Sequence, residues 1–324
     1  MRAAKIIAGR TSLSCDPNSP RQSYPWHLSV ATAASEQASH NLTFTLHGVV
    51  HPSSFRYLDS KQIPMVDIHC HILPGLDDGA DTLETSIQMA EMAIAEGVTH
   101  VVGTPHANSH YKFDPEIIRQ RRDELQAAVG ERLKLATGCD FHLSFDNLQD
   151  LEKNHLKYTI NQKNYLLVEF DEFSIPPSMD ETMHHLHLIG LSPIITHPER
   201  NAMLRAKPER MYRWLHQGSY VQITAQSILG RFGTSAQQLA EQWLNEDRVH
   251  FVASDAHNMK SRPLQLRDAF DAVAKRRGEQ VAQALFRDNP LAAFEGRSLP
   301  YEPEQPDPDA KPSPYRKRKR FIFF

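Results

Sequence analysis

Three features are scarce in this 324-residue sequence, and each scarcity excludes a class of protein. Only three cysteines occur, Cys15, Cys70 and Cys139, so the chain has no disulfide framework of the kind that staples small secreted domains. No apolar run approaches the ~18 residues of a membrane-spanning helix, and the apolar stretch after Met1 is too short for a secretory signal. We therefore expect a cytoplasmic protein without stable membrane insertion.

Charge of one sign is also scarce, because the formal net charge is −3 and charged residues make up 23% of the chain. This balance gives no basic footprint for a nucleic-acid partner, and we expect none. Histidine, in contrast, occurs 18 times, which favours metal chemistry without placing it.

The chain divides into three segments by composition. Residues 1–64 are rich in Ser, Ala, Pro and His, and only the run "LTFTLHGVV" resembles a strand, so we predict a disordered extension or a mis-called start upstream of Met65. Residues 65–299 carry regular α/β patterning. Residues 300–324 are Pro-rich, then acidic, basic and aromatic, which indicates a flexible basic tail.

Apolar runs of strand length alternate with helical patterns in the middle segment. The predicted strands are Val66–His69, Val98–Gly103, Leu133–Gly138, Tyr165–Glu169, Ser192–His197, Tyr220–Thr224 and Val249–Ser254. Their near-continuous apolar character is typical of parallel strands covered by helices. Seven β–α units predict an α/β fold that forms a closed or distorted barrel rather than an open sheet.

Two helices have clear start signals. Asp81 with Glu84 forms a capping box for a helix that Gly97 can end. Asp114 followed by Pro115 begins a second helix through "EIIRQRRDELQAAVG".

Polar side chains gather where the predicted strands end. They are His69, His71, His106, Asp140, Glu169, His197, Asp255 and His257. A single histidine with apolar neighbours is more often structural than a ligand, but here only one of seven strand ends lacks a candidate. Because the carboxyl ends of parallel barrel strands meet at one mouth, the joint pattern predicts a site there.

The spacing and chemistry of these residues favour a metal site. His69/His71 and Asp255/His257 are i, i+2 pairs, so in extended chain each pair points to one face. The mixture of imidazoles and carboxylates suits Mn, Zn or Fe(II) rather than Ca. Cys70 and Cys139 are predicted to be buried, inert thiols.

Five motifs together resemble the polymerase and histidinol phosphatase (PHP) superfamily, and more narrowly its bacterial metal-dependent tyrosine-protein phosphatases of capsule and exopolysaccharide biosynthesis. They are "DIHCHILPGLDDGA", "GTPH", "YLLVEF", "PIITHPERN" and "ASDAHN". The resemblance covers about residues 65–299. It implies a distorted (β/α)7 TIM-like barrel that holds three divalent metal ions, usually Mn, with Zn or Fe as alternatives.

The resemblance also implies a role for each motif residue. The first ion would be held by His69, His71 and Asp255, with Asp140 as a bridging carboxylate. The second would be held by Asp140, Glu169 and His197, and the third by Asp78, His106 and His257. The phosphate-binding arginines would be Arg200 and Arg262, and Asp77 would be a turn residue behind the ligands.

Asp140 departs from the pattern of the family, which usually has Glu at the bridging position. The side chain is one methylene shorter, so metal affinity or occupancy is expected to differ. His142, two residues on, is a partial substitute if the chain is extended.

The function implied by the resemblance is hydrolysis of phosphotyrosine by a metal-activated hydroxide without a phosphoenzyme. The expected partner is a bacterial tyrosine kinase of polysaccharide assembly. Two alternatives stay open: a phosphatase for histidinol phosphate or another small molecule on the same site, and a non-catalytic metal-binding module.

Two further patterns have weaker support. "CDPNSPR" at Cys15–Arg21 has the Cys-x5-Arg spacing of cysteine-based tyrosine phosphatases, but two prolines remove backbone donors and no helix signal follows, which favours chance. His184, His185 and His187 could bind metal, but an outer helix face is the better interpretation.

Overall fold

The computed structural model describes residues 63–303. The predicted extension up to Gln62, the "LTFTLHGVV" run, the Cys15–Arg21 pattern and the tail from residue 304 lie outside the described residues. Among the helices of residues 63–303, none combines the length and the apolar character needed to cross a membrane.

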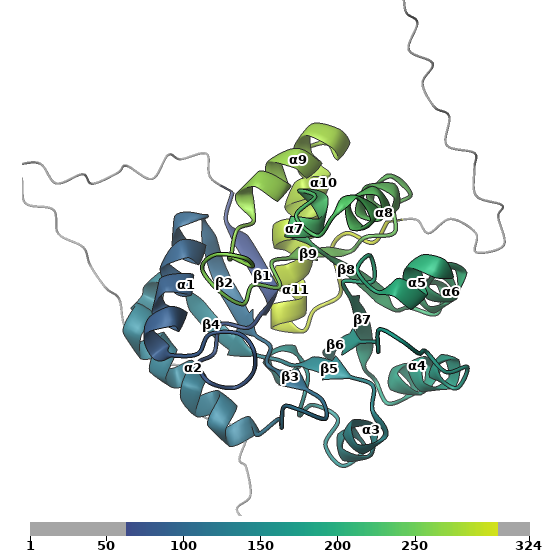
Figure 1. Ribbon diagram of the computed structural model, residues 1–324, viewed down its shortest axis with the longest axis horizontal. Coiled ribbons are helices and arrows are strands. Elements are labelled where there is room, and N and C mark those ends of the chain that lie inside the picture. The colour runs from purple at the N-terminus through teal and green to yellow at the C-terminus, as the bar shows by residue number, and fades with distance from the viewer. Residues whose placement is uncertain (1–62, 304–324) are drawn as a thin grey trace, which may run out of the picture. The chain divides into compact units, whose positions relative to one another are not determined.

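Nine parallel strands are described, in two sheets (Figure 1). The three-stranded sheet has the order β1 (Met65–Cys70), β2 (Val98–Gly103), β4 (Lys134–Thr137). The six-stranded sheet has the order β3 (His106–Ala107), β5 (Asp140–His142), β6 (Tyr165–Glu169), β7 (Ser192–Thr196), β8 (Tyr220–Thr224), β9 (Phe251–Ala253). All seven predicted strands are present, and the α/β fold with parallel strands is confirmed.

The short strands β3 and β5 were not predicted. Each continues a longer strand, β2 or β4, after a break at Thr104–Pro105 and at Gly138–Cys139. Segments of two and three residues are too short to show any period in the sequence. They matter because they carry His106 and Asp140.

The first and last strands also meet. The Asp255 N–H donates to the His69 carbonyl (2.8 Å), and the His71 N–H donates to the Ala256 carbonyl (2.9 Å). Strand β9 therefore extends its pairing to β1 at the carboxyl ends of both, which brings the first and last motifs side by side.

Most of the helices lie around the outside of the strands (Figure 1). Those following β1 to β6 are α1 (Leu83–Ala95), α2 (Pro115–Val129), α3 (Phe145–Leu151) and α4 (Met179–Leu188). Those following β7 and β8 are α5 (Ala202–Ala206), α6 (Glu209–His216), α7 (Ala225–Ile228) and α8 (Thr234–Asn245). The last helices of the described residues are α9 (Arg267–Arg277), α10 (Glu279–Gln283), a π-helical turn (Ala284–Asp288) and α11 (Asn289–Glu295).

One helix start was predicted correctly and one was wrong by a residue. Asp114 caps α2, accepting hydrogen bonds from the next turn, with Pro115 in first position. The cap of α1 is Thr82 rather than Asp81, because the Asp81 carboxylate accepts the Thr85 hydroxyl (2.7 Å) and Thr82 accepts the Thr85 N–H (3.2 Å). Gly97 follows the end of α1 at φ 86°, a conformation that glycine adopts without strain.

Apolar side chains from the strands of both sheets pack together in one buried cluster. They include Val66, Ile68, Val102, Ala136, Leu167, Ile194, Phe251 and Ala253, packed with Ala292, Ala293 and Phe294 of α11. A second, larger cluster lies mainly between the strands and the outer helices. Helix α11 therefore shares its core with the strands of both sheets.

Candidate metal centre

All nine residues predicted as metal ligands come together at the carboxyl ends of the strands. Five imidazoles and four carboxylates form four overlapping groups, and within each group one donor atom per residue lies within 4.8 Å of the others. The groups are His71/Asp78/His106/His257, His69/His71/Asp140, His69/His197/Asp255 and His106/Asp140/Glu169.

The groups share residues with the three expected ligand sets but do not reproduce them. The set of Asp78, His106 and His257 is together, with His71 added. Three residues of the first set lie together, since His69 Nε2 and His71 Nε2 are each 3.5 Å from Asp255 Oδ1. Glu169 groups with His106 and Asp140, and its Oε1 lies 3.8 Å from His197 Nε2.

Asp140 lies at the middle of the cluster although its side chain is short. It is fully buried, and its Oδ2 is 3.4 Å from His69 Nε2, 3.5 Å from His106 Nδ1 and 3.8 Å from His197 Nε2. Strand β5 brings the backbone close enough for an aspartate to reach three imidazoles. His142, at the far end of β5, belongs to none of the four groups and lines a separate cavity.

Hydrogen bonds behind three histidines direct their Nε2 atoms into the cluster. The His69 Nδ1–H donates to Gln222 Oε1 (3.0 Å), and the His71 Nδ1–H donates to Asp77 Oδ2 (2.6 Å). The His257 Nδ1–H donates to the Asp255 carbonyl (3.0 Å). Such partners fix the tautomer and leave the Nε2 lone pair for a metal ion.

Three buried atoms of the candidate ligands have no hydrogen-bond partner among the described residues. They are Asp140 Oδ2, His106 Nδ1 and His257 Nε2. A buried polar atom left unpaired costs about 1–3 kcal/mol, so their convergence on one volume fits a bound cation. Nitrogen and carboxylate donors at these positions are the types that Mn, Zn and Fe(II) take.

The environment separates the pKa values of neighbouring groups. Burial, with the nearby charge of Asp140, raises the pKa of Glu169 to about 8. Burial, with the charge of Arg200, lowers the pKa of His197 to about 4, so this imidazole is neutral at physiological pH. A neutral imidazole is the form that binds a metal ion.

Two of the candidate ligands lie on strained backbone. His197 has φ 32° and Asp255 has φ 51°, in the left-handed region that non-glycine residues rarely adopt. Such outliers cost about 1–3 kcal/mol each and cluster at functional sites. Here they turn two side chains into the cluster at the ends of β7 and β9.

Arg200 and Arg262 lie at the rim of the cluster, from the loops after β7 and β9. Both guanidinium groups donate to Asp255 Oδ2. Both also face the ring of Phe232, with their Cζ atoms 4.4 Å and 6.0 Å from its centroid. Two cations converging beside the candidate ligands form a place for the oxygens of a phosphoryl group.

Some residues of the site were not predicted. Gln222, which holds His69, lies on β8, the one strand end without a candidate, and its position inside the apolar run "YVQIT" was the available signal. Tyr111 stacks on His106 (centroids 5.9 Å apart, planes at 17°). Neither Tyr111 nor Phe232 has a sequence pattern that would have singled it out.

The remaining predictions about reactive side chains are confirmed. Cys70 and Cys139 are fully buried, and burial raises the pKa of each thiol well above its usual value. Asp77 lies in the turn after β1, where it accepts from the N–H groups of Gly79 and His106 as well as from His71. The three histidines at 184–187 lie on α4, outside the cluster.

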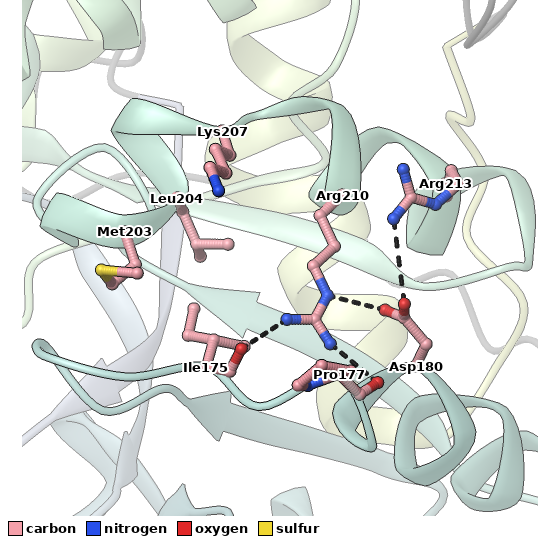
Figure 2. Close-up of a pocket in the computed structure, with 8 residues that line it drawn as sticks. All are labelled: Ile175, Pro177, Asp180, Met203, Leu204, Lys207, Arg210 and Arg213. Carbon is pink, nitrogen blue, oxygen red and sulfur yellow. Dashed lines mark hydrogen bonds and ion pairs between the residues drawn. The ribbon is translucent and has the colours of Figure 1, made fainter.

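A cavity of about 350 Å³ lies away from the nine candidate ligands, against α4, α5 and α6 (Figure 2). Its lining is Ile175, Pro177, Asp180, Met203, Leu204, Lys207, Arg210 and Arg213. It contains no set of metal-ligating side chains.

Comparison with known proteins identifies relatives over most of the chain. A family model described as capsular polysaccharide synthesis, CpsB/CapC, matches residues 65–295. The chain is 33% identical to tyrosine-protein phosphatase YwqE of Bacillus subtilis over 264 residues, which is 80% of this chain and 100% of the relative. It is 31% identical to tyrosine-protein phosphatase CpsB of Streptococcus pneumoniae over 237 residues, 70% of this chain and 96% of the relative.

A solved structure of the same group of phosphatases also matches this chain. It comes from a study of YwqE from Bacillus subtilis and CpsB from Streptococcus pneumoniae, described there as unique metal-dependent tyrosine phosphatases. The match has a TM-score of 0.70 at 32% identity and covers 75% of this chain and 99% of the solved one.

Proposed function

This chain belongs to the CpsB/CapC family of capsular polysaccharide synthesis, and on that premise we propose that it is a metal-dependent protein-tyrosine phosphatase. One observation carries the proposal: nine ligand-type side chains and two arginines gather at one set of strand ends. The family resemblance supports three divalent ions, with Mn as the first choice, and the mixture of imidazoles and carboxylates suits Mn, Zn or Fe(II). The parallel strands and the β1–β9 contacts support a distorted (β/α)7 barrel.

The side chains have complementary tasks in phosphate ester hydrolysis. Divalent ions held by the imidazoles and carboxylates would supply Lewis acidity and lower the pKa of water toward neutrality. Arg200 and Arg262 would donate to the equatorial oxygens of the phosphoryl group, where charge develops. Phe232 keeps both guanidinium groups in place for this contact.

A covalent phosphoenzyme is not needed in this scheme. The two described cysteines are buried thiols with raised pKa values, so neither is an available nucleophile. A tyrosine leaving group has a conjugate-acid pKa of about 10, so its departure needs less proton donation than an alkoxide would. The physiological substrate that we propose is a phosphorylated bacterial tyrosine kinase of polysaccharide assembly.

Metal removal tests the proposal directly. We expect the chelated protein to lose activity on p-nitrophenyl phosphate and on a phosphotyrosine peptide, and Mn²⁺ to restore both. Histidinol phosphate, assayed in parallel, should be the poorer substrate. Full activity after thorough chelation, verified by elemental analysis, would contradict the proposal.

Asp140→Asn provides the matched variant. It keeps the shape of the side chain while removing a charge shared by three imidazoles. We expect fewer bound ions per chain and activity about 10- to 100-fold lower, in line with the loss of a group that holds or orients the ligands.

A further inference from the structure

We propose that a groove beside the metal centre binds an acidic segment next to the phosphotyrosine of the protein substrate. The groove consists of two neighbouring cavities bordered by the 170–178 loop, α4, α5 and α6. This inference rests on the proposed function, which supplies the phosphotyrosine, and adds the chemistry of the residues around it.

The first cavity begins next to the candidate ligands. It has a volume of about 190 Å³, and its lining includes His142 and Phe170. His142 follows Asp140 by two residues on β5, and Phe170 directly follows Glu169 at the end of β6. Four of the other six lining residues are apolar: Leu143, Ile175, Pro176 and Met179. The remaining two are Ser174 and Asp171, whose Oδ1 accepts from the N–H groups of Phe173 and Ser174 (both 2.8 Å). A peptide whose phosphotyrosine is at the centre would therefore place a neighbouring apolar side chain here.

The second cavity, of about 350 Å³, shares Ile175 with the first. Its floor is apolar, with Met203 and Leu204, and its rim is charged (Figure 2). The first cavity borders the ends of β5 and β6, and the second borders the basic side chains of Lys207, Arg210 and Arg213.

Hydrogen bonds hold the walls of the groove in place. Asn201, directly after Arg200, donates to the carbonyls of Phe170 (3.2 Å) and Asp171 (3.1 Å) and caps α5. Arg210 donates to the carbonyls of Ile175 (2.6 Å), Pro176 (2.5 Å) and Pro177 (3.0 Å). A preformed groove binds a peptide without first having to be ordered.

The rim has more positive charge than its own carboxylate can neutralise. The lining contains Lys207, Arg210 and Arg213 against one carboxylate, Asp180. Asp180 Oδ1 already accepts from Arg210 Nε (2.8 Å) and from the Trp214 indole (2.8 Å), while Arg213 lies 3.8 Å from Oδ2. In Figure 2 Lys207 extends from the chain between α5 and α6 with no bond drawn to the other lining residues.

This surplus selects the chemistry of the occupant. Lys207 is exposed and has no ion pair among the described residues, and the Arg213 side chain is 54% exposed. In a chain of net charge −3, a local excess of cations attracts an acidic side chain and repels a basic one. The occupant is therefore a segment on one side of the phosphotyrosine. It has an apolar residue nearer to the phosphotyrosine and Asp or Glu further from it.

Matched phosphotyrosine peptides test this inference on the full-length, Mn-loaded protein. Glu is placed on the N-terminal or the C-terminal side of the tyrosine, and Gln or Lys replaces it in the controls. We expect one acidic peptide to have a kcat/KM about 5-fold above its Gln counterpart, the size expected for one or two exposed charge pairs. Lys207→Glu should abolish this preference and leave p-nitrophenyl phosphate hydrolysis unchanged.

Arg205→Glu is the control for overall charge. Arg205 lies on α5 two residues before Lys207, but it lines a different hollow with Ser235 and Gln238. The same charge reversal there should keep the preference for the acidic peptide. Equal effects of the two reversals, or equal rates for the acidic and Gln peptides, would overturn the inference.

Binding gives a readout that does not depend on turnover. Fluorescence anisotropy with the same peptides carrying a non-hydrolysable phosphonate in place of the phosphate should show the same preference and the same loss in Lys207→Glu. No hydrolysis of any phosphotyrosine substrate would contradict the proposed function instead. A lower molecular mass for Lys207→Glu by light scattering would assign the groove to a second copy of the chain, which also overturns the inference.

Discussion

Replacing Asp77 by Asn tests whether a side chain that is hydrogen-bonded to a candidate ligand determines metal affinity. Asp77 Oδ2 accepts from the His71 imidazole (2.6 Å) and the His106 N–H (3.1 Å), while Oδ1 accepts from the Gly79 N–H (3.0 Å). Asn has only one acceptor oxygen. If this oxygen accepts from His71 and His106, the amide NH₂ faces the Gly79 N–H, which is also a donor. Burial raises the pKa of Asp77, but its interaction with His71 and the hydrogen bond from the Gly79 N–H lower it below its usual value, so the change to Asn removes a full negative charge at neutral pH.

The expected loss follows from that bond. A short hydrogen bond to a charged group contributes about 1.5–3 kcal/mol, and loss of such a partner of a metal-bound histidine weakens binding about 10- to 100-fold. We therefore expect the Mn²⁺ dissociation constant, measured by calorimetry or chelator competition, to rise by that factor. At saturating Mn²⁺, kcat should recover to within about 3-fold, because the ligands themselves are intact.

Asp81→Asn is the matched control. Asp81 lies four residues further on, and its carboxylate accepts from the exposed Thr85 hydroxyl rather than from a histidine. We expect unchanged Mn²⁺ affinity. An unchanged dissociation constant in a folded Asp77→Asn protein would refute the positioning role, and a kcat that stays low at saturating Mn²⁺ would show that Asp77 acts in the reaction itself.

Three further outcomes are expected. Phe232→Leu should weaken competitive inhibition by inorganic phosphate about 5-fold through loss of two cation–π contacts, with recovery in Phe232→Tyr and no effect of Phe145→Leu. Burial lowers the pKa of His250 from 6.5 to about 3. As the pH decreases below 6.5, this histidine is protonated in the unfolded chain but not in the folded one, so the free energy of unfolding decreases. Urea unfolding should show about 1.4 kcal/mol lost by pH 5.5, and a smaller loss in His250→Gln. Cys15→Ser should leave phosphatase activity unchanged, since Pro17 and Pro20 remove donors from a phosphate loop there.

The sequence allowed prediction of the strands and of the residues that meet at their ends. Strands β1 and β6 to β8 differ from their predicted bounds by no more than one residue at either end. Parallel strands that are buried on both faces appear in the sequence as near-continuous apolar runs, so their bounds can be predicted. The cap of α1 was wrong because two adjacent polar side chains competed for the same turn. That choice depends on side-chain contacts of a few tenths of an ångström, which a residue pattern does not encode.

The sequence predicted which residues lie in the cluster better than it predicted which of them lie close together, and the reason is geometric. A strand end fixes which side chains enter the site, but the breaks after β2 and β4 shift His106 and Asp140 onto β3 and β5. Strand β3 pairs with β5, and β5 pairs with β6. That shift places His106 beside Glu169 as well as beside Asp78, so one imidazole reaches two groups. It also lets a short aspartate occupy the central position, because β5 carries the backbone of Asp140 inward. The shorter side chain is therefore compatible with the site, and an Asp140→Glu variant would have to displace the imidazoles of His69 and His106 to fit.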